Sequence, residues 1–214
     1  MKLIKSKLFF VFLVLLTIGI TVSASNISEL DLFKKEIHKI GSEVRNINKN
    51  ARSKDISEKV ILEIGDEKIA LEQFETVGAG LKTKDKNKIA DFIIRGTLLN
   101  KIAQDNGIIV SDSDIKNYMQ ELKSFIENNA NAKERFDIYL ESFGFTEKEF
   151  WNNEKTFDQY RSALLQGKYR SYLRKYFTNK YKNKTLNEIN ELVNKRIETL
   201  IEIEKKNIKI KKHF

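Results

Sequence analysis

The sequence predicts a mainly α-helical protein with two short strands, and three observations support this prediction. Proline is absent from all 214 residues, so the chain lacks the residue that most often breaks helices. Apolar side chains recur at spacings of three and four over most of the chain, which is the helical period. Only two short segments are typical of strands instead, Val60–Ile64 and Ile208–Lys211.

The N-terminal 24 residues have the layout of a secretory signal peptide. Lys2, Lys5 and Lys7 precede the apolar run Leu8–Ile20, and Val22–Ala24 offers a small-residue cleavage site. The run is shorter than the roughly 20 residues of a membrane span, which favours cleavage over a permanent anchor. We therefore expect export to an extracytoplasmic location, with membrane tethering if the leader is retained. Removal of this leader, with its three lysines, lowers the formal net charge of the chain from +9 to +6.

Residues 25–57 are predicted to form an N-terminal helix and a linker. Six apolar residues between Leu30 and Ile47 are separated alternately by three and four positions, which predicts a helix over Ile27–Ile47. The stretch is short and contains Gly41, so a helix docked on its own domain is favoured over a coiled coil. The polar segment Asn48–Ser57 is predicted to be the linker, and the core domain then covers residues 58–214.

The core domain begins with the strand Val60–Ile64, which ends at the turn Gly65–Asp66. Gly107 is predicted to close the second helix of this domain as a left-handed cap. From the apolar periodicity, helices are expected at Leu71–Leu81, Lys88–Asn106, Asp112–Asn128, Lys133–Phe143, Glu147–Lys182 (as one helix or a pair) and Leu186–Lys206.

Helix starts carry a recurring capping pattern. Ser111 and Thr146 each precede an acid by three positions, Asp114 and Glu149, so side chain and backbone can cap one another reciprocally. Ala70 occupies the equivalent position of an earlier helix without a capping oxygen, which weakens that start by about 1 kcal/mol.

Composition excludes several classes of function. Cysteine is absent and histidine occurs only as His38 and His213, which removes disulfides, thiolate metal sites, cysteine nucleophiles and a lipid-modified cysteine. Histidine metal sites and Ser/His/Asp triads would have to combine the two ends of the chain. We therefore expect no metal, no cofactor and no catalytic residues.

Five segments in order resemble a known family: Val60–Gly65, Glu72–Glu75, Ile94–Ile115, Phe143–Trp151 and Tyr160–Leu165. Together they are similar to the N-terminal chaperone domain of SurA-like and PrsA-like exported foldases, over about residues 60–173. The resemblance implies that the first strand pairs with the C-terminal strand around a helical body. It also implies binding of unfolded or newly exported polypeptides through apolar grooves.

The same resemblance argues against catalysis. Family members with prolyl isomerase activity carry a separate parvulin domain between the helical body and the C-terminal elements, whereas here only Thr178–Thr185 separates Phe177 from the last helix. The expectation is a non-catalytic chaperone (holdase), related to prolyl isomerases by family name only. The alternative is an envelope adaptor or structural protein that uses the heptad helix 27–47 to hold a partner.

Residues that contact a client polypeptide should be apolar, exposed and adaptable. The candidates are Tyr118, Met119, Leu122, Phe136, Tyr139, Leu140, Phe143 and Trp151, with Phe125, Phe150 and Phe157 as further members. For any single one of them a place in the core is favoured over client contact, because periodic apolar stripes usually face inward.

The segment Tyr169–Lys184 interleaves aromatic and basic residues. It is either the solvated basic face of an amphipathic helix or a site for anionic envelope polymer, lipid headgroups or acidic client segments. Nucleic acid, which such a pattern also suits, is not expected for an exported protein. The oligomeric state is left open by the sequence.

Overall fold

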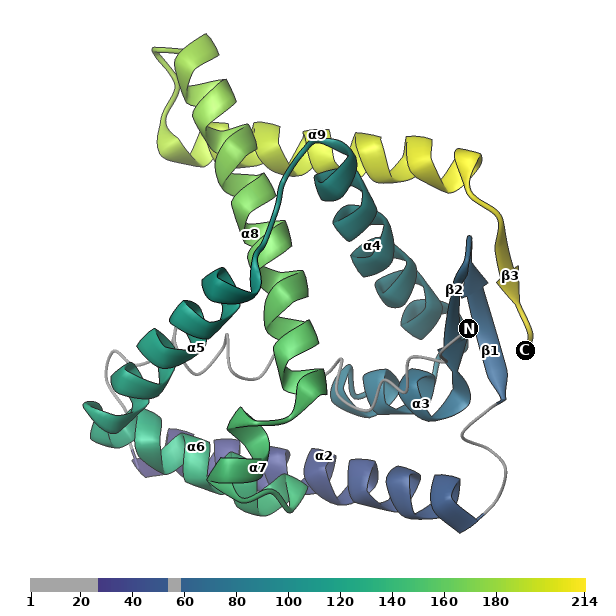
Figure 1. The fold of residues 1–214 in the computed structure, drawn as a ribbon, viewed down its shortest axis with the longest axis vertical. Helices are drawn as coiled ribbons and strands as arrows, with labels where there is room; N and C mark the ends of the chain where they lie inside the picture. The colour runs from purple at the N-terminus through teal and green to yellow at the C-terminus, as the bar shows by residue number, and fades with distance from the viewer. Residues whose placement is uncertain (1–26, 54–58) are drawn as a thin grey trace.

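The computed structural model describes residues 27–53 and 59–214, and it is mainly α-helical with one three-stranded sheet (Figure 1). None of the described helices combines the length and the apolar character needed to cross a membrane. The signal peptide predicted at residues 1–24 lies outside the described residues. The elements are α2 (Ile27–Ser53), β1 (Val60–Ile64), β2 (Glu67–Ala70), α3 (Leu71–Gly80), α4 (Lys86–Asp105), α5 (Asp112–Glu127), α6 (Ala130–Phe143), α7 (Glu147–Trp151), α8 (Glu154–Lys180), α9 (Leu186–Asn207) and β3 (Ile210–Lys212).

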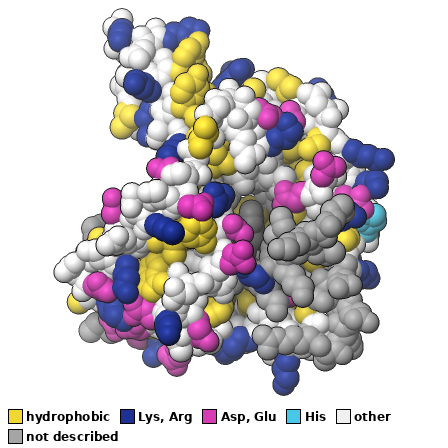
Figure 2. Space-filling view, in the orientation of Figure 1, with side chains coloured by type: hydrophobic (Ala, Val, Ile, Leu, Met, Phe, Trp, Pro, Cys, Tyr) yellow, Lys and Arg dark blue, Asp and Glu magenta, His cyan; other side chains and the backbone are white. Residues whose placement is uncertain are grey.

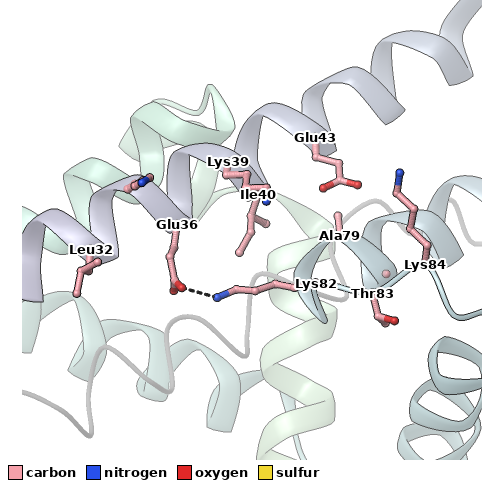
Figure 3. Close-up of a pocket in the computed structure, with 11 residues that line it drawn as sticks. Leu32, Glu36, Lys39, Ile40, Glu43, Ala79, Lys82, Thr83 and Lys84 are labelled. Carbon is pink, nitrogen blue, oxygen red and sulfur yellow. Dashed lines mark ion pairs between the residues drawn. The ribbon is translucent and has the colours of Figure 1, made fainter.

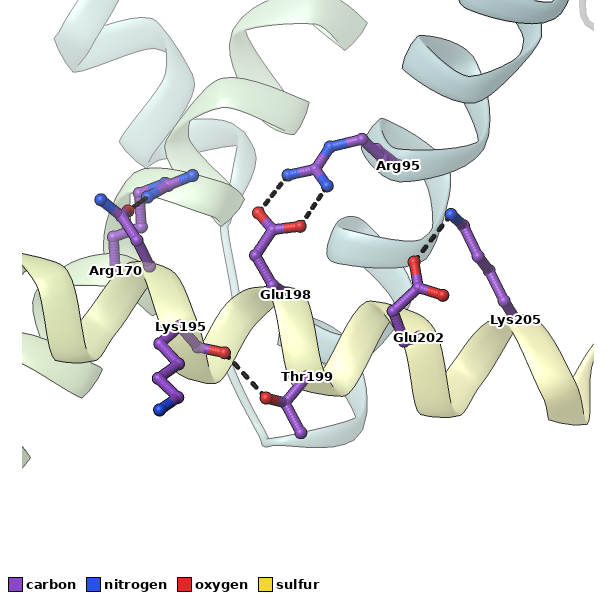
Figure 4. Close-up of polar contacts among 8 residues, drawn as sticks. Arg95, Arg170, Lys195, Glu198, Thr199, Glu202 and Lys205 are labelled. Atoms are coloured by element: carbon purple, nitrogen blue, oxygen red, sulfur yellow. Dashed lines mark hydrogen bonds and ion pairs between the residues drawn. The ribbon is translucent and has the colours of Figure 1, made fainter.

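Helix α8 is the central element of the fold. Helices α5 and α7 pack against its N-terminal half, α4 packs against its middle at Ser162 and Gln166, and α9 packs against its C-terminal half (Figure 1). Helix α2 lies along α6 and α3 at one side of the molecule. The bidentate ion pair between Arg95 of α4 and Glu198 of α9 fastens the last helix to the body (Figure 4) and lowers the pKa of the Glu198 carboxyl.

The sheet joins the two ends of the core domain. Strand β1 lies in the middle and is antiparallel to both β2 and β3, with Glu63 opposite Lys68 on one side and Lys211 on the other. The pairing of the first and last strands, implied by the family resemblance, is confirmed. Strand β2 was not predicted. It forms because Gly65, at φ 58°, allows a tight turn that folds Glu67 back onto Ile64.

Helix α2 belongs to the same hydrophobic core as the rest of the chain. Ile37, Ile40 and Val44 are at most 5% exposed, so the docked helix favoured by the sequence is what the structure shows. The linker predicted at Asn48–Ser57 is wrong for residues 48–53, which continue α2. Without proline or glycine there, buried Ala51 extends the apolar face of the helix.

The contact between α2 and α6 depends on Gly41. A Cβ atom at this position would lie 2.2 Å from the carbonyl oxygen of Ser142, so only glycine allows the two helices to approach so closely. The Arg45 guanidinium donates to the carbonyls of Glu141 and Ser142 at the end of α6. The Glu141 carbonyl also accepts from the Gly144 amide at 3.2 Å, and Arg45 adds a donor from α2 to the last carbonyls of α6.

The capping predictions are confirmed. Ser111 and Thr146 both form reciprocal capping boxes, and Ala70 makes no side-chain cap. The predicted segment Glu147–Lys182 is a pair of helices, because Asn153 starts α8 as a new cap. Thr185 forms a third capping box with Glu188 at the start of α9, which the sequence analysis did not single out.

Candidate functional site

The aromatic side chains of α6 and α7 form a tightly packed cluster. The Phe136 ring lies 5.2 Å from Phe150 and 5.5 Å from Trp151, and Tyr139 stacks on Phe143 at 4.5 Å. All of them except Trp151 are buried. Burial also raises the pKa of the Tyr139 hydroxyl far above its ordinary value. The cluster therefore holds α6 and α7 together and does not present a free aromatic surface.

The structure divides the predicted client-binding residues into two groups. Those inside the core are Met119, Phe136, Tyr139, Leu140 and Phe143, together with Phe150. Those that reach the surface are Tyr118, Leu122, Trp151 and Phe157, which are half-buried, and Phe125, which is 42% exposed. In this conformation only the second group can touch a large partner.

The surface group forms one patch, here called the α5–α7–α8 patch (Tyr118, Leu122, Phe125, Trp151 and Phe157). The three α5 residues share one helical face because they are four and three positions apart. The Tyr118 ring lies 5.7 Å from Tyr160 of α8, which joins α5 to α8. Figure 2 shows hydrophobic side chains gathered where these three helices meet.

Paired charges surround this patch. Lys123 of α5 lies 3.7 Å from Glu147 of α7, and the Trp151 indole donates to the same carboxylate at 3.3 Å. Arg161 of α8 bonds to Asp112 at 2.7 Å while it stacks over Phe157. These charges neutralise one another, so the border of the patch carries no strong excess of either sign of charge.

Apart from this patch, the structure has a groove with a volume of about 690 Å³ between α2 and the end of α3 (Figure 3). Its apolar lining includes Leu32, Ile40 and Ala79, and Lys82 bridges it by an ion pair of 2.8 Å to Glu36. Sequence reasoning missed this groove. Periodicity gave no signal for it, because the groove depends on how α2 and the end of α3 are placed relative to each other.

The described residues contain no cluster of three His, Cys, Asp or Glu side chains that could hold a metal ion. Both histidines contact other parts of the fold: His38 lies 2.8 Å from the Ser142 hydroxyl, and His213 lies 2.9 Å from Glu63. One is in the α2–α6 contact and the other in the β1–β3 contact. The structure therefore does not assemble them with a shared nucleophile or ligand set.

These features define a helical domain that is closed by its first and last strands. The sequence model of the SurA-like N-terminal domain family matches residues 7–157. This is more than half of the chain, and the chain belongs to that family. The match includes all of α2 and ends early in α8, so α9 and most of α8 lie beyond it. No curated protein and no solved structure matches the chain.

Proposed function

We propose that this protein is an exported holdase, a chaperone that binds unfolded or newly exported polypeptides without catalysis. The observation that carries the proposal is a SurA-like N-terminal domain with partly exposed apolar side chains from three helices on one patch. The lysine-rich leader with its apolar run supports export. The proposal requires no nucleotide and no metal.

The chemistry of the patch suits weak binding of many sequences. Aromatic and leucine side chains offer contact area without a shaped pocket, so they accept different apolar segments. A client segment that buried about 300 Å² of apolar surface here would gain about 7.5 kcal/mol before the cost of ordering the client is subtracted. The remaining affinity is low enough for clients to leave without an energy source.

The alternative adaptor function has lost its main support. It relied on the heptad face of the N-terminal helix, and Ile37, Ile40 and Val44 of that face are buried against the protein's own core. Prolyl isomerase activity is likewise not proposed, because only Tyr181–Thr185 connects α8 to α9 at the place where relatives carry a parvulin domain. An unchanged cis/trans exchange rate in a model peptide at saturating protein is the expected result.

Light scattering from a chemically unfolded client tests the holdase proposal. Residues 25–214 at near-equal molar ratio should suppress the aggregation of the client. The double variant Leu122→Ser/Phe125→Ser should lose most of this effect, because both side chains reach the surface of the patch. Ile203→Ser is the matched control, since Ile203 is 49% exposed on α9, away from the patch.

Two outcomes would contradict the proposal in different ways. Absence of suppression by the wild-type chain at several-fold excess would exclude a general holdase. Loss of suppression in Leu32→Ser, with the patch variant unchanged, would move the client site to the groove between α2 and α3. Circular dichroism of each variant verifies that the helical fold is retained.

A further inference from the structure

The end of α8 and the start of α9 form an arm that projects beyond the rest of the molecule (Figure 1). We define the arm as residues 170–190. Arg174 bonds to Asn190 at 3.1 Å and joins its two helices, and Arg170 bonds at 2.9 Å to Asn194, just beyond the arm on α9. The arm lies outside the part of the chain matched by the family model, so the family does not assign it a role.

The arm is strongly and one-sidedly charged. Residues 170–190 contain six lysines and arginines and a single carboxylate, Glu188. One of these cations, Lys184, pairs with Glu188. Five others have no carboxylate within ion-pair distance in the part of the chain that the structure describes: Arg170, Arg174, Lys175, Lys180 and Lys182.

Large apolar groups are exposed beside these cations. Tyr172, Tyr176 and Leu186 are 51%, 48% and 64% exposed. One side of α8 carries Tyr172, Lys175 and Tyr176, because residues three and four positions after Tyr172 lie on the same face of a helix. The Lys180 ammonium lies 5.7 Å from the centre of the Tyr176 ring. Figure 2 shows hydrophobic and basic side chains next to each other on the arm.

We propose that the arm docks the protein on an anionic lipid surface. Unpaired lysines and arginines complement lipid phosphates, and tyrosines with one polar and one apolar end suit the boundary between headgroups and acyl chains. A soluble polyanion would use the cations but gives Leu186 and the tyrosines no apolar partner. The exposed tyrosines and leucine therefore favour a membrane over a polymer.

This site is separate from the proposed client site. The α5–α7–α8 patch lies beside the N-terminal half of α8, whereas the arm is formed by its C-terminal end (Figure 1). A chaperone docked in this way would keep the patch free to receive polypeptides near the membrane. The arm variants described next should accordingly suppress client aggregation as well as the wild-type chain does.

Co-sedimentation with lipid vesicles tests the docking proposal. Residues 25–214 are used, because every described core residue lies after residue 36 and the apolar leader would itself bind lipid. The chain should bind phosphatidylglycerol-containing vesicles and not pure phosphatidylcholine vesicles. Lys175→Glu/Lys182→Glu should lower the apparent association constant at least about tenfold. Tyr172→Ser/Tyr176→Ser should also weaken binding.

The control is Lys206→Glu/Lys209→Glu, which makes the same charge change at two exposed positions at and just after the other end of α9. Binding of this control variant to the vesicles should stay within about twofold of wild type. Equal binding to both vesicle types, or equal losses in the control and arm variants, would overturn the proposal. A soluble poly(glycerol phosphate) that binds as tightly as the vesicles, with no effect of the tyrosine variant, would overturn it in favour of a polymer. Circular dichroism excludes misfolding as the cause of any loss.

Discussion

At the scale of single residues, Gly41 illustrates how a small side chain fixes the position of a whole helix. Because it has no Cβ, α2 approaches the end of α6 closely enough for Arg45 to bond to the Glu141 and Ser142 carbonyls. The same contact brings His38 within 2.8 Å of the Ser142 hydroxyl. The arrangement of α2 therefore depends on one missing methyl group.

Gly41→Ala should lower the free energy of unfolding by about 1–3 kcal/mol, since the new Cβ meets backbone that cannot move aside cheaply. This loss should outweigh the gain of about 1 kcal/mol that alanine brings to a helix interior. Gly167→Ala in α8 is the matched control, because nothing lies within 4 Å of its Cβ position. It should stabilise the protein by about 0.5–1 kcal/mol. Urea unfolding measures both values, and effects of the same sign would contradict the account.

The sequence located the apolar residues well but could not decide which of them face solvent. Met119 and Leu122 lie on the same apolar stripe of α5, yet Met119 is buried and Leu122 reaches the surface. The difference arises from how α6 and α8 pack against α5, which periodicity does not contain. For the same reason Gly41 was seen only as an interruption of the heptad pattern.

At the scale of elements, the capped helix starts explain why the helices begin where the sequence predicts. Every predicted helix of the core domain is present. The first and last residues of each predicted segment lie within three residues of those in the structure. Local side-chain signals fix these ends, as Ser111 and Thr146 show. Strand β2 escaped prediction because four residues carry little periodic signal and its partner is set by the turn at Gly65.

Helix capping also makes stability dependent on pH. Bonds from the Ser111 backbone and side chain, and from Lys168, lower the pKa of Asp114 from 3.8 to about 2. Lys184 and Thr185 lower the pKa of Glu188 from 4.5 to about 2. A carboxyl whose pKa falls on folding stabilises the native state above its ordinary pKa. That contribution is lost as the pH falls through the folded-state value.

Asp114→Asn and Glu188→Gln should therefore lower the melting temperature at pH 7, and each difference from wild type should shrink between pH 4.5 and pH 2. Thermal melts followed by circular dichroism across this range measure the effect. Glu191→Gln serves as a control, because Glu191 is exposed and has no ion pair among the described residues. A difference that is the same at pH 7 and pH 2 would show that the carboxylate charge is not what stabilises these helix starts.

At the scale of the whole molecule, the C-terminal strand closes the fold. The Gly65 amide donates to the Lys209 carbonyl at 2.8 Å, and the His213 amide donates to the Ile61 carbonyl at 3.0 Å. Ile208 and Ile210 are partly buried against the core. The family resemblance predicted this closure, because composition and periodicity say nothing about which distant strands pair.

Removal of residues 208–214 should lower the free energy of unfolding by about 2–4 kcal/mol, the value of two partly buried isoleucines and a lost strand. Hydrogen exchange then provides a local measurement. The Gly65 amide should lose protection, whereas the Leu71 amide, which bonds to the Lys59 carbonyl, should keep it. An equal loss of protection at both amides would mean that β3 stabilises the whole fold and not only the neighbouring strand β1.

Client polypeptides are proposed to bind the α5–α7–α8 patch, and Trp151 reports on this binding directly. It is the only tryptophan in the chain and is half-buried within the patch. Titration with an unfolded, tryptophan-free polypeptide should shift its fluorescence to shorter wavelength and protect it from a soluble quencher. Unchanged emission under conditions where the protein suppresses client aggregation would contradict the claim and place the clients elsewhere on the molecule.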